Sequence, residues 1–322
     1  MQTSWIRSAI AVPILGLPLE AAGTTHMPLS SFTQLMENER RHRPTADAWR
    51  SGEAMQLESL SQLGQAIGNS RNLGEALKTF AHGFPLLQSN TSVELSIMDH
   101  EAHVSYRVLD PHIWPRRADA ELSLGLIRGI CARFGISRDA VLGVSFEHEP
   151  DGATRDLVQH LGVAPAFGRD ENRLRLAVSA LSNRPVVARH DDYTASWRQL
   201  EQALRRQRSD TDLSARVYSH ILQRIGHGPA SQADTADALG ISERSLRRGL
   251  AAQGSSFSEI MENCRRMQGY ALLTRSDRPL SEIALLLGYS DQTAFSRAFA
   301  RWYGVPPREL RRSGALEESV IR

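Results

Sequence analysis

The last third of the chain contains the same short pattern twice, and this repeat restricts the possible folds more than any other feature of the sequence. Residues 235–250 and 282–299 each hold a short apolar helical segment, a glycine, one apolar residue, a serine, and a second helical segment with apolar residues four apart. The two glycines, Gly240 and Gly288, are 48 residues apart. Because glycine readily adopts the left-handed conformation that ends a helix, the pattern predicts two helix-turn-helix units.

The second helix of each unit begins after a capping residue, Ser242 or Asp291, whose side chain accepts hydrogen bonds from the free N–H groups of the helix. The apolar residues that face inward are Leu246 and Leu250 in the first unit and Phe295, Phe299 and Trp302 in the second. The outward residues are Arg244, Arg247 and Arg248 in the first unit and Gln292, Thr293, Ser296 and Arg297 in the second.

These outward residue types are the ones that read DNA bases. Arginine pairs with guanine, glutamine pairs with adenine, and serine or threonine contacts several base edges. The alternative is that both helices expose ordinary solvated surfaces. Because two such units follow one another in tandem, the sequence favours double-stranded operator DNA as the partner.

At these residues the sequence resembles the DNA-binding domain of the AraC/XylS family of bacterial transcription regulators. The resemblance covers about residues 215–312 and is most specific over residues 280–312. It implies seven helices, with a long connecting helix at about residues 257–274. It aligns Arg244, Arg247, Arg248, Gln292, Thr293 and Arg297 with the groove-facing positions of the family. Gly249 and Gly269 depart from the family pattern, and each is expected to cost its helix about 1 kcal/mol relative to alanine.

Parts of the first two-thirds resemble the ligand-binding domain of one AraC subfamily, the group of ornithine- and arginine-responsive regulators with an arabinose-binding-like N-terminal domain. The stretches that carry the resemblance are residues 62–77, 146–150 and 163–174. The resemblance implies a sensor for a small molecule, and it identifies no ligand.

The pattern of elements predicts an α+β sensor domain at residues 1–190, a linker helix at 191–214 and an all-α DNA-binding domain at 215–314, with helix-turn-helix motifs at about 232–253 and 281–303. Helices are expected at residues 5–17, 29–42, 53–68, 73–84, 118–134 and 154–161, a hairpin at 93–98 and 103–109, and further strands at 141–147 and 173–178. The helix content argues against a sensor of the all-β jelly-roll type.

The linker helix has an apolar stripe formed by Tyr193, Trp197, Leu200 and Leu204. Because these residues recur on one side of a helix, they are expected to be buried. The stripe either packs on the sensor domain or meets a partner subunit in a homodimer.

Charge and cysteine content agree with a soluble regulator. The net charge is +2, with 15 arginines and 11 acidic residues from residue 215 onward, an asymmetry that fits a DNA-binding C-terminal part. The two cysteines, Cys131 and Cys264, lack the spacing of a metal site. Near the N-terminus, prolines and Glu20 interrupt a faint signal-peptide outline. We therefore expect a cytoplasmic protein with no metal, no cofactor and no membrane association.

Sequence signatures of catalysis are missing, so we expect no enzyme. The His148-Glu149-Pro150 stretch lacks the second histidine of a zinc-protease helix. There is also no nucleophile elbow, phosphate loop or dinucleotide-binding fingerprint.

The sequence therefore predicts a ligand-responsive transcription regulator of the activator type, which binds operator DNA and a small-molecule effector and contacts RNA polymerase. The alternative is a constitutive DNA-binding regulator whose N-terminal domain only dimerises or contacts a partner. The candidate residues for effector binding are Trp114, Glu147, His148 and Glu149.

Overall fold

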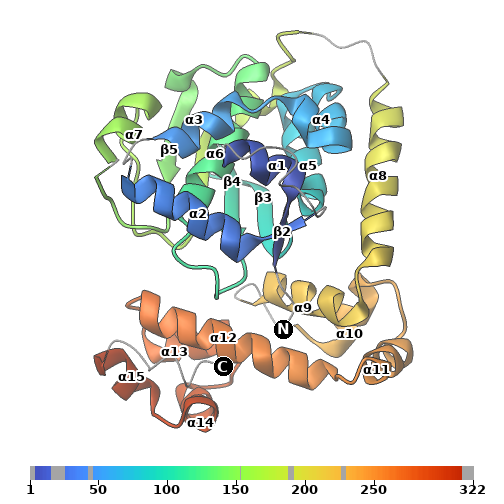
Figure 1. Ribbon diagram of the computed structural model, residues 1–322, viewed down its shortest axis with the longest axis vertical. Helices are drawn as coiled ribbons and strands as arrows, with labels where there is room; N and C mark the ends of the chain where they lie inside the picture. Colours follow the sequence, from blue (N-terminus) through green and yellow to red (C-terminus); the bar gives the residue numbers. More distant parts are fainter. Residues whose placement is uncertain are drawn as a thin grey trace. The chain divides into compact units, whose positions relative to one another are not determined.

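A computed structural model describes residues 4–15, 26–42, 46–152, 154–187, 192–225 and 230–313 (Figure 1). The chain forms two compact units. The N-terminal unit comprises Met1–Leu109 and Ile113–Ser209, and the C-terminal unit comprises Asp110–His112 and Asp210–Arg322. Among the described residues, no helix is long and apolar enough to span a bilayer.

The N-terminal unit mixes helices with two antiparallel sheets. In chain order its elements are β1 (Trp5–Arg7), α1 (Ser8–Ile14), β2 (His26–Pro28), α2 (Leu29–His42), α3 (Asp47–Ala54), α4 (Ser61–Gly68), α5 (Leu73–Gly83), β3 (Thr91–Met98), β4 (Glu101–Val108), α6 (Arg117–Arg133), β5 (Val141–Ser145), α7 (Thr154–Leu161), β6 (Asn172–Ala177) and α8 (Tyr193–Asp210). The larger sheet has the strand order β3-β4-β6-β5, and β1 pairs with β2. The predicted α+β architecture is confirmed.

The predicted hairpin is formed by β3 and β4, with Met98 opposite Glu101 and Thr91 opposite Val108. Its turn is shorter than expected, because only Asp99 and His100 lie between the strands. Both residues have positive φ angles, +49° and +64°. Two consecutive left-handed residues give the turn a twist that matches that of the paired strands.

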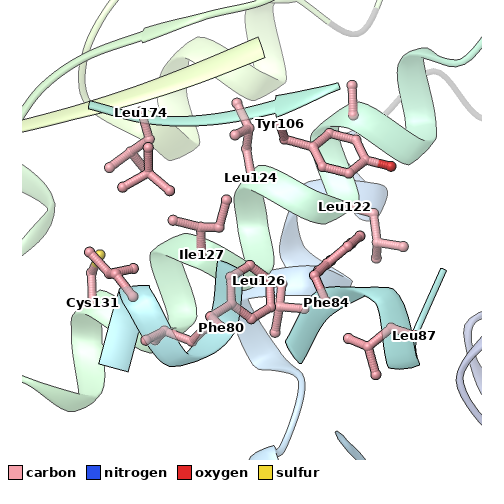
Figure 2. Packing of buried hydrophobic residues seen from close by; sticks show 14 of the residues in the cluster. Phe80, Phe84, Leu87, Tyr106, Leu122, Leu124, Leu126, Ile127, Cys131 and Leu174 are labelled. Carbon is pink, nitrogen blue, oxygen red and sulfur yellow. The ribbon is translucent and has the colours of Figure 1, made fainter. Parts of the chain in front are cut away.

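Helix α6, expected from the sequence at residues 118–134, is buried on all sides from Ala118 to Cys131, although a helix at the surface of a core would bury only one apolar stripe. It lies between the sheet, represented by Tyr106 and Leu174, and helix α5 with the turn that follows it, represented by Phe80 and Phe84 (Figure 2). Even its charged residues are buried, because they have partners inside the unit: Asp119, Glu121 and Arg128. The helix is therefore the centre of the core rather than one side of it.

Glycines let α3 approach α6 closely. A Cβ atom on Gly125 would lie 2.3 Å from the carbonyl oxygen of Trp49, and one on Gly129 would lie 2.6 Å from that of Glu53. Larger residues would force these backbones apart, so the two glycines are required by the packing.

Two further expectations needed correction. The segment predicted as a helix over residues 5–17 begins as strand β1, whose pairing with β2 (Trp5 opposite Pro28) overrides the local helical pattern; residues 16 and 17 lie outside the described part. Residues 53–68, expected as one helix, hold the end of α3, a 3₁₀ turn at Leu57–Leu60 and then α4, because the chain is extended at Met55 and Gln56.

The apolar stripe of α8 packs on the N-terminal unit, which is the first of the two alternatives considered for it. Leu200 and Leu204 are buried in the core of that unit. The Trp197 ring stacks on the imidazole of His82 with 5.0 Å between ring centroids, and Asn69 donates a hydrogen bond of 2.6 Å to Ser196.

The C-terminal unit is helical throughout its described residues. Its seven helices are α9 (Leu213–Arg224), α10 (Gln232–Ala238), α11 (Glu243–Ala252), α12 (Phe257–Arg275), α13 (Leu280–Leu286), α14 (Gln292–Tyr303) and α15 (Pro307–Ser313). This number agrees with the family resemblance, and α12 is the long connecting helix.

Candidate nucleic-acid interface

The turns of the two helix-turn-helix units have the same backbone geometry. Gly240 and Gly288 have φ angles of +68° and +77°. In the first turn the Ile241 N–H donates to the carbonyl of Ala236 at 3.0 Å, and in the second the Tyr289 N–H donates to that of Ala284 at 2.9 Å. Each is the six-residue hydrogen bond that closes a helix at a left-handed glycine. The predicted role of the two glycines is confirmed.

Both recognition helices, α11 and α14, begin at the predicted caps. The Ser242 hydroxyl accepts a hydrogen bond of 3.1 Å from the Ser245 N–H. The Asp291 carboxylate accepts a hydrogen bond of 2.8 Å from the Ala294 N–H. This hydrogen bond and one from the Ser290 hydroxyl lower the pKa of Asp291. The caps fix where each recognition helix starts, and therefore which of its side chains face outward.

The inward sides of the recognition helices are apolar. Leu246 and Leu250 of α11 are fully buried. In α14 the buried stripe is Phe295, Phe299 and Tyr303, with 4.7 Å between the ring centroids of Phe299 and Tyr303. Trp302, which was expected in this stripe, is only half-buried, because Tyr303 occupies the position one residue further along the helix.

The outward sides carry the predicted polar residues. Arg244, Arg247 and Arg248 of α11 are exposed, as are Thr293 and Arg297 of α14. Gln292 and Ser296 are half-buried. Within the described residues none of the four arginines forms an ion pair, so their guanidinium groups are available to an external acceptor.

Within the C-terminal unit, helix α12 connects the two helix-turn-helix units. It begins with a capping box, in which Ser256 and Glu259 each accept a hydrogen bond from the other's backbone N–H. Its 19 residues span about 28 Å at 1.5 Å per residue. That length is comparable to the 34–36 Å helical repeat of DNA, so the connection suits two helices that enter successive major grooves.

The four residues proposed for effector binding do not converge on one cavity. Arg116 links two of them: its guanidinium lies 5.7 Å from the ring centroid of the exposed Trp114, and its Nε donates to Glu147 at 2.6 Å. Burial raises the pKa of Glu147, but Arg116 outweighs this effect and holds it below its usual value. Trp114, Arg116 and Glu147 therefore form one cluster.

His148 belongs to a separate, buried cluster. Its Nδ1 bonds to the carbonyl of Glu149 at 3.0 Å, and its Nε2 lies 3.6 Å from Glu121, which Arg40 contacts at 2.6 Å. Burial lowers the pKa of His148 to about 4 and raises that of Glu121 to about 7. The Glu149 side chain is exposed beside Gly168.

Comparison with known proteins assigns both parts of the chain. Residues 235–313 match the helix-turn-helix domain model. Residues 15–186 match the model of the arabinose-binding domain of AraC transcription regulators. The chain belongs to the AraC family of transcription regulators. This result confirms the resemblance inferred from the sequence, and it places the protein among transcription regulators rather than enzymes.

The chain is similar to other transcription regulators over most of its length. The HTH-type transcriptional regulator VirS of Mycobacterium tuberculosis is 29% identical over 251 residues, which cover 78% of this chain and 72% of VirS. The ornithine utilization regulator of Pseudomonas aeruginosa is 28% identical over 261 residues, which cover 81% of this chain and 76% of that protein. The crystal structure of the transcriptional regulator CdpR from Pseudomonas aeruginosa aligns with 21% identity and a TM-score of 0.43, over 94% of this chain and 96% of CdpR.

Two residues of α12 that support α14 in this AraC-family regulator were not predicted from the sequence. Glu262 of α12 accepts hydrogen bonds from Trp302 at 2.8 Å and Arg301 at 2.7 Å. Arg265 lies 5.1 Å from the ring centroid of Tyr289 and donates to the carbonyl of Gly288. Both side chains tie α12 to the second unit, and no local sequence signal reveals them because their partners are 23 to 40 residues away.

The two unusual glycines of the AraC-type domain have packing reasons. A Cβ atom on Gly249 would lie 2.5 Å from Cδ2 of Leu213, and one on Gly269 would lie 3.2 Å from Cδ1 of Leu287. Both glycines cost helix propensity. In return, Gly249 lets α11 lie close to α9, and Gly269 lets α12 lie close to the second helix-turn-helix unit.

Among the described residues, no group of three or more histidine, cysteine, aspartate or glutamate side chains is placed to hold a metal ion. Both cysteines are buried, and burial raises the pKa of Cys131 to about 12.

Proposed function

We propose that this AraC-family protein is a ligand-responsive, sequence-specific regulator of the activator type, which reads operator DNA with α11 and α14. The observation that supports this proposal is the tandem arrangement of the two helices on one unit, each with a buried apolar side and an outward polar side. Arg244, Arg247 and Arg248 are the proposed contacts of the first helix. Gln292, Thr293, Ser296 and Arg297 are those of the second.

Exposed Arg297 is the strongest single candidate for reading a base. It is one turn beyond Thr293 on α14, and arginine pairs bidentately with guanine in the major groove. If Arg297 reads a base, Arg297→Ala weakens binding of the operator by about 1–3 kcal/mol and leaves binding of unrelated DNA nearly unchanged. Equal loss for both DNAs would assign Arg297 to a phosphate instead.

The effector is proposed to bind the N-terminal unit, with the cluster of Trp114, Arg116 and Glu147 as the preferred site. An aromatic ring, a guanidinium and a carboxylate lie together there, and such groups suit a small polar metabolite. His148 and Glu149 remain weaker candidates, since His148 is buried against Glu121 and Glu149 points to solvent near Gly168.

The test is operator titration by the full-length protein with and without metabolites that a thermal-shift screen identifies, since a bound ligand raises the melting temperature by mass action. Effector and operator must change each other's affinity by the same factor. If no metabolite changes either measurement, the protein is a constitutive regulator whose N-terminal unit dimerises or contacts a partner. Contact with RNA polymerase, homodimer formation and action in the cytoplasm, where bacterial DNA lies, are further parts of this proposal.

A further inference from the structure

Most of the exposed polar side chains on one face of helix α8 are arginines and glutamines. The residues of this arginine–glutamine face are all exposed, and they are Arg198, Gln199, Gln202, Arg205 and Arg206. They lie opposite Leu200 and Leu204, which anchor the helix in the core of the N-terminal unit. Every one of these side chains donates hydrogen bonds, and the face carries three positive charges.

Two acidic residues of α8, Glu201 and Asp210, flank the face. Within the part of the chain that the structure describes, Arg198, Arg205 and Arg206 form no ion pair. The acidic residue near the middle of the helix, Glu201, is bound to His82 at 2.5 Å on another side of α8. Asp210 is the last residue of the helix. The face is therefore complementary to a partner with several negative charges and many acceptors.

The face is close in the chain to α9, the first helix of the C-terminal unit. Helix α8 ends at Asp210 and α9 begins at Leu213. Two residues join them, and the three Cα–Cα steps span at most about 11 Å. The connection is ordered at its end by Asp212, whose carboxylate caps α9 by accepting a hydrogen bond of 2.7 Å from the Ala215 N–H.

Within the C-terminal unit, the start of α9 lies against α11. Leu213 fills the space beside Gly249, whose Cβ, if present, would be 2.5 Å away. The Gln253 amide oxygen at the end of α11 accepts hydrogen bonds from the backbone N–H and the hydroxyl of Ser214, at 2.9 and 2.6 Å. The chain thus enters the C-terminal unit beside the last turns of the helix proposed to read the first half-site.

We propose that the arginine–glutamine face of α8 binds phosphates of the DNA that flanks the segment read by α11. This inference rests on the proposed function, because it requires that α11 occupy a major groove. The guanidinium fork matches phosphate oxygens bidentately, and glutamine amides also donate to phosphates. Such contacts add affinity and salt dependence but no base preference. The N-terminal unit, through α8, is then part of the DNA-binding surface as well as the sensor.

The experiment compares the full-length wild type with the R198Q/R205Q/R206Q variant on two DNAs. One DNA carries the operator with flanking sequence on both sides, and the other is trimmed at the edge of the segment protected by α11. Three phosphate contacts add about 2.7 to the slope of log affinity against log salt concentration, at about 0.9 per phosphate. On the long DNA, raising salt from 50 to 200 mM should therefore weaken the wild type about 40-fold more than the variant. Trimming should reduce this difference to near zero.

Two further variants separate a local contact from general charge effects. The R198K/R205K/R206K variant keeps the charges and should retain most of the salt slope. The R41Q/R155Q/R184Q variant removes three positive charges from other exposed positions of the N-terminal unit and should keep the wild-type slope. If this control loses the slope as well, net charge rather than the face is responsible, and the proposal is wrong.

The remaining outcomes also decide whether the arginine–glutamine face binds DNA. Equal salt slopes for wild type and R198Q/R205Q/R206Q on the long DNA would overturn the proposal. If the slopes are equal but the variant activates transcription less in a purified system, the face binds an acidic protein surface instead of DNA. If the wild type binds no operator at all, the proposed function itself fails, which is a result distinct from normal wild-type binding with an unchanged slope.

Discussion

Phe299 of α14 should contribute more to stability than Trp302, although tryptophan is the larger side chain. Phe299 is fully buried between Phe295 and Tyr303, with ring centroid distances of 5.6 and 4.7 Å. Removing a buried phenylalanine side chain costs about 3–5 kcal/mol, and the two lost ring contacts place Phe299→Ala near 4 kcal/mol. Trp302 is half-buried, so Trp302→Ala removes about 100 Å² from contact and costs about 2 kcal/mol.

Amide hydrogen exchange in the full-length protein measures this difference locally. Peptides from α12 and α14 report the free energy of opening of the C-terminal unit, independently of the N-terminal unit. Phe299→Ala should lower that free energy about twice as much as Trp302→Ala. The reasoning would be refuted if Trp302→Ala cost as much as Phe299→Ala, because Trp302 would then belong to the buried stripe.

Three further predictions concern the support of the reading helix and the N-terminal unit. Glu262→Gln should weaken operator binding several-fold, because Glu262 positions α14 through Trp302. In operator titrations the slope of log affinity against log salt concentration should change little. A changed slope without loss of base preference would contradict this role. Leu200→Ala should destabilise the N-terminal unit by about 2–5 kcal/mol in urea unfolding, and a wild-type midpoint would show that α8 detaches freely. His148 has its folded pKa lowered to about 4 by burial, so its contribution to stability is complete above pH 6.5 and is lost as the pH falls toward 4. Relative to His148→Phe, the wild type should therefore lose up to about 2 kcal/mol between pH 7 and pH 5; the same loss in both proteins would exclude His148 as the cause.

Local signals in the sequence predicted the elements that local interactions determine. Ser242 and Asp291 were recognisable as caps because a cap acts within three residues. The left-handed glycines at 240 and 288 were recognisable for the same reason. The outward polar side of each recognition helix then followed from helical periodicity.

Features that depend on distant partners could not be predicted in this way. The charged residues of α6 are buried because Arg40 meets Glu121 from another helix, and a periodicity analysis treats such residues as solvent-facing. Arg116 reaches Glu147 over 31 positions of sequence, so the separation of the effector candidates into two clusters had no local signal.

Two reading helices on one unit should leave two separate marks on DNA. A hydroxyl-radical footprint of the full-length protein, on an operator selected from random sequence, should show two protected backbone segments about 10–10.5 base pairs apart on one face of the duplex. Arg247→Ala should weaken one segment and Arg297→Ala the other. A single protected segment, or loss of both segments to the same extent in each variant, would contradict the assignment of α11 and α14 as two independent reading helices.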